Sequence, residues 1–205
     1  MNEDLFSATQ RLEYVPMQDA EVYYLRHLSL SEPADDIMQH LIDEVPWKAE
    51  KIVVWGKTFP QPRLIAWYGD SGKSYTYSGI HLNPLPWTPV LLDIKSRVEA
   101  VVGDEFNSAL LNYYRDHRDS MGLHSDDEPE LGQCPIIASL SLGEERLFIL
   151  KHKTRKDLKS VRLKLASSSL LLMKGETQQH WKHGIEKKTC PCGPRVNLTF
   201  RRIHL

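Results

Sequence analysis

Most of the chain consists of short apolar segments separated by turn residues, and this pattern restricts the fold more than any other feature. The segments are four to nine residues long and rich in Val, Ile, Leu and Phe, which is typical of β-strands rather than helices. Strands this short need two sheets that pack face to face, in a sandwich or a jelly roll. The predicted strands are 21–25, 51–59 with a break at Gly56, 106–114, 136–142, 146–151, 161–165, 170–173 and 196–203.

Two amphipathic helices are predicted before the main series of strands. The first has Ser31 as its N-cap, apolar residues at helical spacing, and an end before Pro46. The second has Thr88 as its N-cap and ends at Gly103. Helices followed by a run of strands indicate the α+β class.

The length and charge of the chain restrict its organisation and its partners. A chain of 205 residues is long enough for one domain with a sizeable core. Its 26 basic and 27 acidic residues almost cancel, but they are unevenly placed. Residues 1–50 hold 11 acidic and three basic residues, whereas residues 144–205 hold 15 Lys or Arg and five acidic residues. The polar segment 151–164 alone holds seven of those basic residues, so this half is a candidate surface for a polyanion.

Cysteine use and hydropathy favour a reducing compartment. Three cysteines do not make the disulfide framework of a secreted domain. The first residues are acidic and lack the apolar core of a signal peptide, and no apolar run approaches the length needed to cross a bilayer. The sequence therefore predicts a monomer of the cytoplasm, or of the nucleus if the source is eukaryotic, with no membrane partner.

The stretch His124-Ser125-Asp126, taken with the distant His183, predicts a metal site. Two imidazoles and one carboxylate can occupy one face of a metal and leave the opposite positions open for substrate and O2, which is the ligand set of non-haem Fe(II). A second His-x-Asp stretch is formed by His117 and Asp119. Periodicity does not choose between the two.

Other interpretations of these residues are weaker. His117-Arg118-Asp119 is also found in the catalytic loop of protein kinases, but no Asp-Phe-Gly or glycine-rich phosphate loop accompanies it. Cys190 and Cys192 with His183 lack the second cysteine pair of a structural zinc site, so free thiols are the simpler interpretation. His180 and His183 could share a metal on a helix, whereas on a strand they would face opposite ways.

The closing run of the chain predicts a clamp for a small diacid. On a strand, Arg195 and Arg201 share one face and are about 20 Å apart at roughly 3.3 Å per residue. One carboxylate cannot hold both, but a diacid could, because guanidinium groups bind carboxylates in a bidentate way. Beside a facial iron site, this clamp suggests 2-oxoglutarate as co-substrate. The alternative is that both arginines are surface residues on a half-exposed strand.

Together these residues resemble the AlkB family of Fe(II)- and 2-oxoglutarate-dependent nucleic-acid dealkylases, most closely its duplex DNA-repair members. The resemblance covers most of residues 52–203, and the closing run with its two arginines is its most specific part. It also selects His124 and Asp126 over the earlier His-x-Asp stretch. The matching stretches are 54–57, 62–63, 68–70, 75–79, 82–84, 86–87, 111–114, 124–128, 137–143, 183 and 194–201.

The resemblance implies a fold and a division of the chain. The expected fold is α+β, with a double-stranded β-helix (jelly-roll) core, N-terminal helices packed on one side and a nucleotide-recognition lid of hairpins. Residues 1–105 would form the N-terminal extension, the helices and the lid. Residues 106–205 would form the jelly-roll catalytic core, and both parts would make one integrated dioxygenase domain.

The resemblance also implies roles for individual residues. Its catalytic iron ligands are His124, Asp126 and His183. Its 2-oxoglutarate ligands are Asn112, Tyr114, Arg195, Asn197 and Arg201. Its base pocket contains Tyr75, Tyr77, Ser78 and Glu128, with one face of the base against His124. Arg63 would approach the nucleic acid, and Trp55 stands where the duplex-repair members carry an aromatic finger.

The implied activity is oxidative demethylation of alkylated DNA, single- or double-stranded, with O2 as oxidant. The expected lesions are N1-methyladenine and N3-methylcytosine, and the products are formaldehyde, succinate and CO2. An RNA demethylase and a family member acting on a substrate other than nucleic acid remain open. A binding module on a scaffold that has lost catalysis is the alternative from another class, and the intact iron and clamp residues argue against it.

Overall fold

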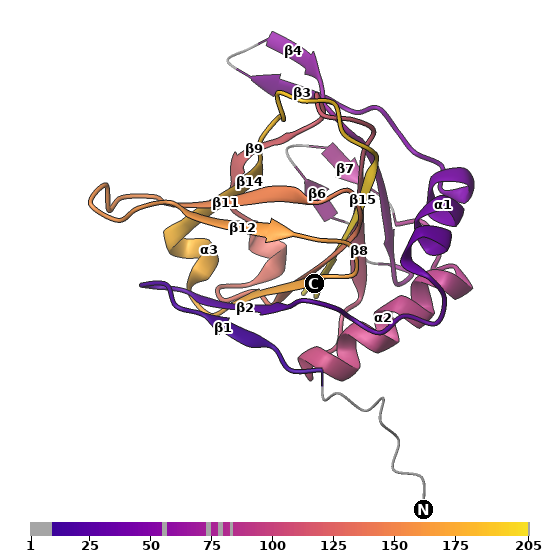
Figure 1. Cartoon of the computed structure of the whole chain (residues 1–205), viewed down its shortest axis with the longest axis horizontal. Helices are drawn as coiled ribbons and strands as arrows, with labels where there is room; N and C mark the ends of the chain where they lie inside the picture. The colour runs from indigo at the N-terminus through magenta and orange to yellow at the C-terminus, as the bar shows by residue number, and fades with distance from the viewer. Residues whose placement is uncertain (1–9, 55–56, 73–74, 78–79, 83, 205) are drawn as a thin grey trace, which may run out of the picture.

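The fold is taken from a computed structural model that describes residues 10–54, 57–72, 75–77, 80–82 and 84–204. Of 52–54, 57–58, 75–77 and 80–82 only the backbone is described. Two β-sheets and two long helices make up most of this part (Figure 1). No helix within these ranges is both long and apolar enough to cross a membrane.

The larger sheet has seven strands in the order β1-β2-β13-β10-β15-β8-β5. Every pair of neighbours in it is antiparallel. β15, the last of these strands in the chain, lies inside the sheet between β10 and β8. The strands are β1 (Glu13–Val15), β2 (Glu21–Leu25), β5 (Leu64–Gly69), β8 (Ser108–Tyr114), β10 (Ile137–Gly143), β13 (Leu170–Lys174) and β15 (Arg195–Arg201).

The smaller sheet has four strands in the order β12-β11-β14-β9, and two hairpins stand apart from both sheets. One hairpin, β3–β4, projects from the top of the molecule in Figure 1. The strands of the smaller sheet are β9 (Met121–His124), β11 (Arg146–His152), β12 (Val161–Leu165) and β14 (Trp181–Ile185). The hairpins consist of β3 (Lys51–Val54) with β4 (Lys57–Pro60), and β6 (Tyr75–Tyr77) with β7 (Ile80–Leu82).

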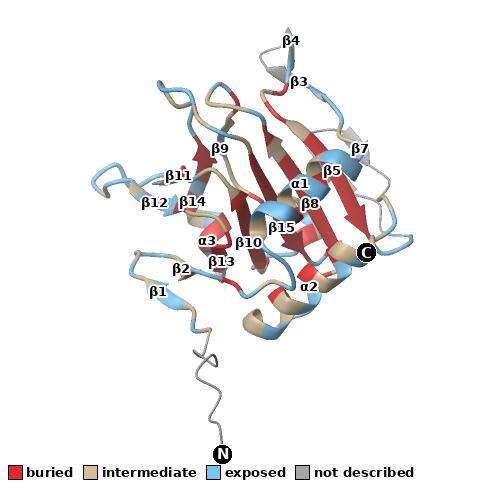
Figure 2. Ribbon diagram, turned by 45° about the vertical axis from the view of Figure 1, so that its right-hand side comes forward, coloured by how far each residue is buried: buried red, intermediate tan, exposed pale blue. Residues whose placement is uncertain are grey.

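Apolar side chains fill both sides of the larger sheet. Between the two sheets, Tyr114, Ile137 and Met173 of the larger one pack with Phe148 and Trp181 of the smaller one. On the other side, the larger sheet packs against the buried faces of α1 (Ala34–Glu44) and α2 (Pro89–Val102). Strands β5, β8, β10, β13 and β15 of this sheet are largely buried, while the helices keep an exposed outer face (Figure 2). The α+β class, the jelly-roll core and the helices on one side are therefore confirmed.

The helix ends confirm one predicted cap and correct the other. The Thr88 side chain accepts a hydrogen bond from the backbone N–H of Leu91, and Gly103 ends α2 with a φ of 78°. Ser31 was expected to cap the first helix, but Pro33 occupies that position with no side-chain hydrogen bond. The Ser31 hydroxyl instead donates to Asp93 on α2, 2.7 Å away, so it joins the two helices.

The predicted strands are found with small shifts in their ends, and several strands were missed. The segment 51–59 is a hairpin rather than one interrupted strand. The strand expected from residue 106 begins at Ser108. The side chain of Asn107, just before it, donates to the carbonyl of Ile203 and accepts from its N–H. The missed elements are β1, β5, β7, β9 and β14, together with the short helices η1 (Pro129–Leu131) and α3 (Thr177–His180).

Candidate metal and co-substrate site

Two neighbouring strands of the smaller sheet bring the predicted iron ligands together. His124 ends β9 and is the register partner of His183 on β14, with ring centroids 4.3 Å apart. Asp126 follows β9 by two residues and is 1 % exposed. The ligand atoms of these three side chains all lie within 4.8 Å of one another. Of the two His-x-Asp stretches, the structure brings together only the later one with His183.

The hydrogen bonds of His124 leave the correct nitrogen for a metal. Its Nδ1 lies 3.0 Å from the carbonyl oxygen of Gly122. A carbonyl only accepts, so Nδ1 carries the proton and Nε2 keeps its lone pair. That Nε2 lies 3.6 Å from Oδ1 of Asp126, and Nε2 of His183 lies 3.8 Å from Oδ2 of the same carboxylate.

The electrostatics keep Asp126 and His183 in their ligand forms. Burial raises the pKa of the Asp126 carboxyl, but Arg201, His124 and His183 outweigh that effect and hold the pKa below its usual range. Burial, followed by the nearby His124, lowers the pKa of His183 to about 3. Asp126 is therefore ionised and His183 neutral at physiological pH, as coordination of a divalent cation requires.

Side chains that the sequence did not single out hold the ligands in place. The Gln178 side chain accepts a hydrogen bond from the backbone N–H of Asp126 at 3.0 Å, and the Ser125 hydroxyl donates to the carbonyl of Trp181 at 3.0 Å. The Phe148 ring stacks on His183 with centroids 5.2 Å apart. Gln178 lies 52 residues from its partner, and no spacing in the sequence marks that contact.

An oxygen of Asp126 that lacks a hydrogen-bond donor among the described residues indicates that these side chains fit Fe(II). Oδ2 of Asp126 is buried and accepts no hydrogen bond within the described part of the chain. A buried carboxylate oxygen without a donor is costly unless a cation compensates it. Two imidazoles and this carboxylate make the two-histidine, one-carboxylate set of non-haem iron.

The closing strand places its arginines in the interior. All seven residues of β15 are buried, and Arg195 and Arg201 are 1 % and 4 % exposed, so the alternative that both are surface residues is wrong. The guanidinium of Arg195 lies over the Tyr114 ring at 5.0 Å and donates to the Ser141 hydroxyl at 2.9 Å. Its Nε and Nη1 are buried and make no hydrogen bond among the residues described. Arg195 is thus a buried cation suited to a carboxylate ligand.

The other predicted co-substrate residues line the same cavity but have partners within the protein. Arg201 donates from Nη2 to Oδ1 of Asp126 at 2.9 Å. The Asn197 amide donates to the Ser139 hydroxyl and to the carbonyl of Leu140, both at 2.8 Å. The open volume between these side chains is about 30 Å³. The cavity is lined by Asn112, Tyr114, Met121, His124, Asp126, Ser139, Phe148, Met173, His183, Gly184, Ile185, Arg195, Asn197, Thr199 and Arg201.

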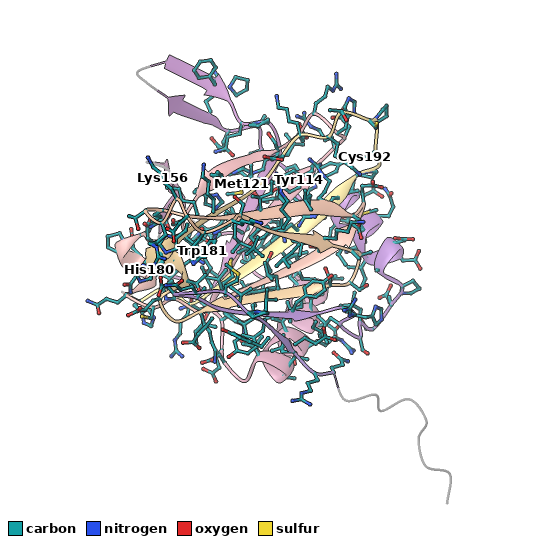
Figure 3. All side chains as sticks on the ribbon, turned by 60° about the vertical axis from the view of Figure 1, so that its left-hand side comes forward. Tyr114, Met121, Lys156, His180, Trp181 and Cys192 are labelled. Atoms are coloured by element: carbon teal, nitrogen blue, oxygen red, sulfur yellow. The ribbon has the colours of Figure 1, made fainter. Side chains whose placement is uncertain are left out.

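A second arginine beside Tyr114 was not predicted. Arg146 is 1 % exposed and its guanidinium lies 5.6 Å from the centre of the Tyr114 ring. It donates to the carbonyls of Asp116, Asp119 and Glu186, which lie in two different loops. Tyr114 lies in the interior beside Met121 of β9, toward which its hydroxyl points (Figure 3). Arg146 therefore fixes the loops that flank this end of the cavity.

The residues predicted for substrate are less fully placed. Trp55 and Ser78 lie outside the described residues, as do the side chains of Tyr75 and Tyr77. Glu128 is half-buried at the start of the 3-10 turn that follows Asp126. Arg63 is 5 % exposed and donates from Nε to the Asn112 side chain at 2.7 Å. The substrate roles assigned to these residues stay predictions.

The carboxylate of the earlier His-x-Asp stretch pairs with an arginine. Asp119 accepts hydrogen bonds from Nε and Nη2 of Arg115 through both of its oxygens, at 2.8 and 2.9 Å. This contact holds the loop after β8 closed, since the two residues are four apart in the chain. The cysteines are not part of a candidate metal site. No group of possible metal ligands found in the described ranges contains a cysteine.

A second group of possible ligands is formed by Asp19, His152 and His180. Nδ1 of His152 accepts backbone N–H bonds from Thr154 and Arg155 at 3.2 and 2.9 Å. The neutral ring therefore carries its proton on Nε2 and offers no lone pair to a metal there. His180 ends α3, next to Trp181 at the start of β14 (Figure 3).

Comparisons with known proteins agree with this site. The family model described as the 2OG-Fe(II) oxygenase superfamily matches residues 21–201. The alpha-ketoglutarate-dependent dioxygenase alkB homolog 3 of Mus musculus is 45 % identical over 179 residues, which is 83 % of this chain. This chain spans only 62 % of the length of that relative.

Two further proteins support the family and the fold. The DNA oxidative demethylase ALKBH2 of Homo sapiens is 43 % identical over 181 residues, covering 84 % of this chain and 69 % of the human protein. A solved structure of OsALKBH1 superposes with a TM-score of 0.63 at 18 % identity, covering 94 % of this chain and all of that one, and so supports the fold alone. This chain belongs to the AlkB family, within the 2OG-Fe(II) oxygenase superfamily.

Proposed function

We propose that this protein is an Fe(II)- and 2-oxoglutarate-dependent dioxygenase that repairs alkylated DNA by demethylating bases such as N1-methyladenine and N3-methylcytosine. The observation that carries the proposal is the meeting of His124, Asp126 and His183 in one cavity with Arg195 of β15. The similarity to proteins named DNA oxidative demethylase supports DNA as the substrate.

The metal would be held by Nε2 of His124, the Asp126 carboxylate and His183. When bound with 2-oxoglutarate and O2, Fe(II) supplies an oxidation that yields succinate and CO2 and hydroxylates the N-alkyl carbon, which then leaves as formaldehyde. Within the protein, Gly122 fixes the tautomer of His124 and Arg201 keeps Asp126 ionised. Gln178 fixes the backbone of Asp126, so the ligands keep their relative positions without a metal.

The co-substrate would bind between β8 and β15. Arg195 would hold one carboxylate, since its buried Nε and Nη1 have no other hydrogen-bond partner among the described residues. Tyr114 and Asn112 are the register partners of Arg195 and Asn197 on the neighbouring strand and line the same cavity. Arg201 would contact the co-substrate with another of its five N–H donors, while Nη2 keeps its bond to Oδ1 of Asp126.

The nucleic acid would approach from the side of the β3–β4 and β6–β7 hairpins, which we propose as the lid over the cavity. Extrusion of a damaged base costs less than that of a normal one, because the damaged base pairs poorly. Tyr75, Tyr77, Ser78 and Glu128 would contact the extruded base, and Trp55 would fill the space that it leaves. Loss of activity on Trp55→Ala is expected to be larger on duplexes than on single strands, and equal losses would reject the wedge role.

The division at residue 105 remains a proposal about one integrated unit. The participation of β1, β2 and β5 in the seven-stranded sheet supports the integration. We also propose that the protein acts as a monomer where the genome lies, in the cytoplasm or in a eukaryotic nucleus. Size-exclusion chromatography with light scattering tests the first point, and imaging of a tagged chain in its own cells tests the second.

The test of the proposed reaction uses protein loaded with Fe(II) without oxygen, then given 2-oxoglutarate, O2 and an oligonucleotide with N1-methyladenine or N3-methylcytosine. Each lesion is presented in single-stranded DNA, duplex DNA and RNA, and mass spectrometry follows the lost methyl group. His124→Ala is expected to reduce demethylation by more than about a hundredfold. His117→Ala, in the other His-x-Asp stretch, is the matched control and should keep full activity.

The outcomes separate the substrate from the chemistry. Preference for RNA would favour the alternative, an RNA demethylase. Succinate formation without demethylation of any oligonucleotide would retain the iron site and reject nucleic acid as the substrate. Arg195→Ala should raise the 2-oxoglutarate concentration required while leaving metal binding intact, and loss of the metal on that change would contradict the clamp.

A further inference from the structure

Arg63 precedes β5 directly and follows β4 of the β3–β4 hairpin by three residues. Its flanking backbone is fixed: the carbonyl of Pro62 accepts from the N–H of Ser120, and the N–H of Gln61 donates to the carbonyl of Glu50, both at 2.8 Å. The side chain is 5 % exposed, so it lies inside the protein rather than along the hairpin.

The contact between Arg63 and Asn112 fixes the direction of an amide. Nε of Arg63 donates to Oδ1 of Asn112 at 2.7 Å, and both side chains are buried. A guanidinium has donors only, so the amide oxygen must face Arg63 and the Nδ2 group must point elsewhere. The usual ambiguity between the two ends of an asparagine amide is thereby removed.

Asn112 lines the cavity that contains the metal-ligand candidates and Arg195, whereas Arg63 is not among the lining residues. The hydrogen bond to Asn112 therefore gives Arg63 an indirect route to a ligand in the cavity. With its oxygen occupied, Asn112 presents to the cavity a group that can only donate.

We propose that Arg63 is a positioning residue for 2-oxoglutarate: it orients Asn112 so that Nδ2 donates to an oxygen of the co-substrate. The assignment rests on the proposed function, since it requires 2-oxoglutarate in this cavity. It gives the segment after the β3–β4 hairpin a role in co-substrate binding rather than in contact with nucleic acid. It also makes the position selective for an acceptor, such as a carboxylate oxygen.

The test measures equilibrium binding of 2-oxoglutarate to the Mn(II)-loaded protein by calorimetry, which needs no turnover. Arg63→Met removes the donor, and Arg63→Gln places an amide nitrogen at the position of Nε and restores it. Arg63→Met should raise the dissociation constant of 2-oxoglutarate roughly tenfold, and Arg63→Gln should recover most of the lost affinity. Binding of Mn(II) alone should stay unchanged in both variants.

A double-mutant cycle is completed by measuring 2-oxoglutarate binding with and without Arg63→Met in a protein that also carries Asn112→Ala. There Arg63→Met should cause little further weakening, because the residue through which it acts is gone. An equal loss in both backgrounds, or unchanged 2-oxoglutarate affinity with weakened binding of an oligonucleotide, would overturn the assignment. If Arg63→Met fails to fold, Asn112→Asp decides, because it keeps an oxygen for Arg63 but turns an acceptor instead of Nδ2 toward the cavity: weakened 2-oxoglutarate binding supports the assignment, and unchanged affinity contradicts it.

Binding of 2-oxoglutarate and demethylation by the unsubstituted protein, measured together, separate this assignment from the proposed function. If the unsubstituted protein binds 2-oxoglutarate but demethylates no oligonucleotide, the substrate is wrong and the positioning role stands. If it does not bind 2-oxoglutarate at all, the proposed function and this assignment both fail.

Discussion

Gly184 separates His183 from Ile185 at the irregular pairing between β14 and β9, and no side chain fits there. A Cβ at this position would lie 2.7 Å from the carbonyl oxygen of Met121 and 3.0 Å from that of Gly122. Both are backbone atoms of the strand that carries His124. The two strands must therefore separate locally by about 0.7 Å to restore an ordinary contact of 3.4 Å.

Gly184→Ala is expected to reduce the free energy of unfolding by about 1–3 kcal/mol, the usual cost of overpacking. In a domain of this size the melting temperature falls by about 2–4 °C for each kcal/mol. The separation also moves His124 away from His183, so metal affinity should fall by about 10- to 100-fold, as when other supports of a metal ligand are lost.

The assay compares thermal unfolding of the metal-free protein with calorimetric binding of Fe(II) under anaerobic conditions. Gly122→Ala is the matched control on the facing strand, since a Cβ there meets nothing within 4 Å and the residue is exposed. It should leave both quantities close to those of the unsubstituted protein. If Gly184→Ala behaved like Gly122→Ala in both assays, the close approach of β9 and β14 would not set the ligand geometry.

Three stability predictions follow, each measured by urea unfolding. Thr88→Ala should lower the free energy of unfolding by about 1 kcal/mol because α2 loses its N-cap. Ser31→Ala should lower it by less than about 0.5 kcal/mol, because Ser31 bonds Asp93 at an exposed site and caps no helix. Equal losses would contradict the caps as described. Phe200→Ala should cost about 3–5 kcal/mol, since the ring is fully buried between sheet and helices, and a cost under about 1 kcal/mol would be inconsistent with that packing. Arg146→Ala should cost about 3 kcal/mol, since carbonyls in two loops lose their donor; a neutral effect would mean that water replaces it without cost.

The core was predictable because its strands are rich in apolar residues. Leu170–Lys174 is an almost continuous apolar run, whereas Ile137–Gly143 alternates apolar residues with Ser139 and Ser141, and both strands are buried along almost their whole length. Strands β9 and β14 were missed although they carry two of the three metal-ligand candidates. Each is four or five residues long, contains a glycine and alternates in no regular way, so nothing in the local pattern distinguishes them from loops.

The candidate site was predictable where its residues are close in sequence or share a strand, and less so elsewhere. His124 and Asp126 are two apart, and Arg195 and Arg201 share a face of β15. The contact of Arg63 with Asn112 joins residues 49 apart, and that of Gln178 with Asp126 joins residues 52 apart. Such contacts depend on how the sheets pack, which single-segment patterns do not contain. The environment of Arg201 was also beyond the pattern, because its partner Asp126 follows a strand of the other sheet.

The position of β15 has a consequence for the order in which the protein assembles. The strand follows every other strand that the structure describes, yet it is hydrogen-bonded on both of its sides, to β10 and to β8. During synthesis, the group β1-β2-β13-β10 and the pair β5-β8 therefore emerge first as two separate edges with unpaired backbone groups. Such edges pair readily with other chains, so the interval before β15 inserts is when the protein is most exposed to aggregation. Arg195 and Arg201 take their places in that same step, so the proposed co-substrate site forms only when the larger sheet is complete.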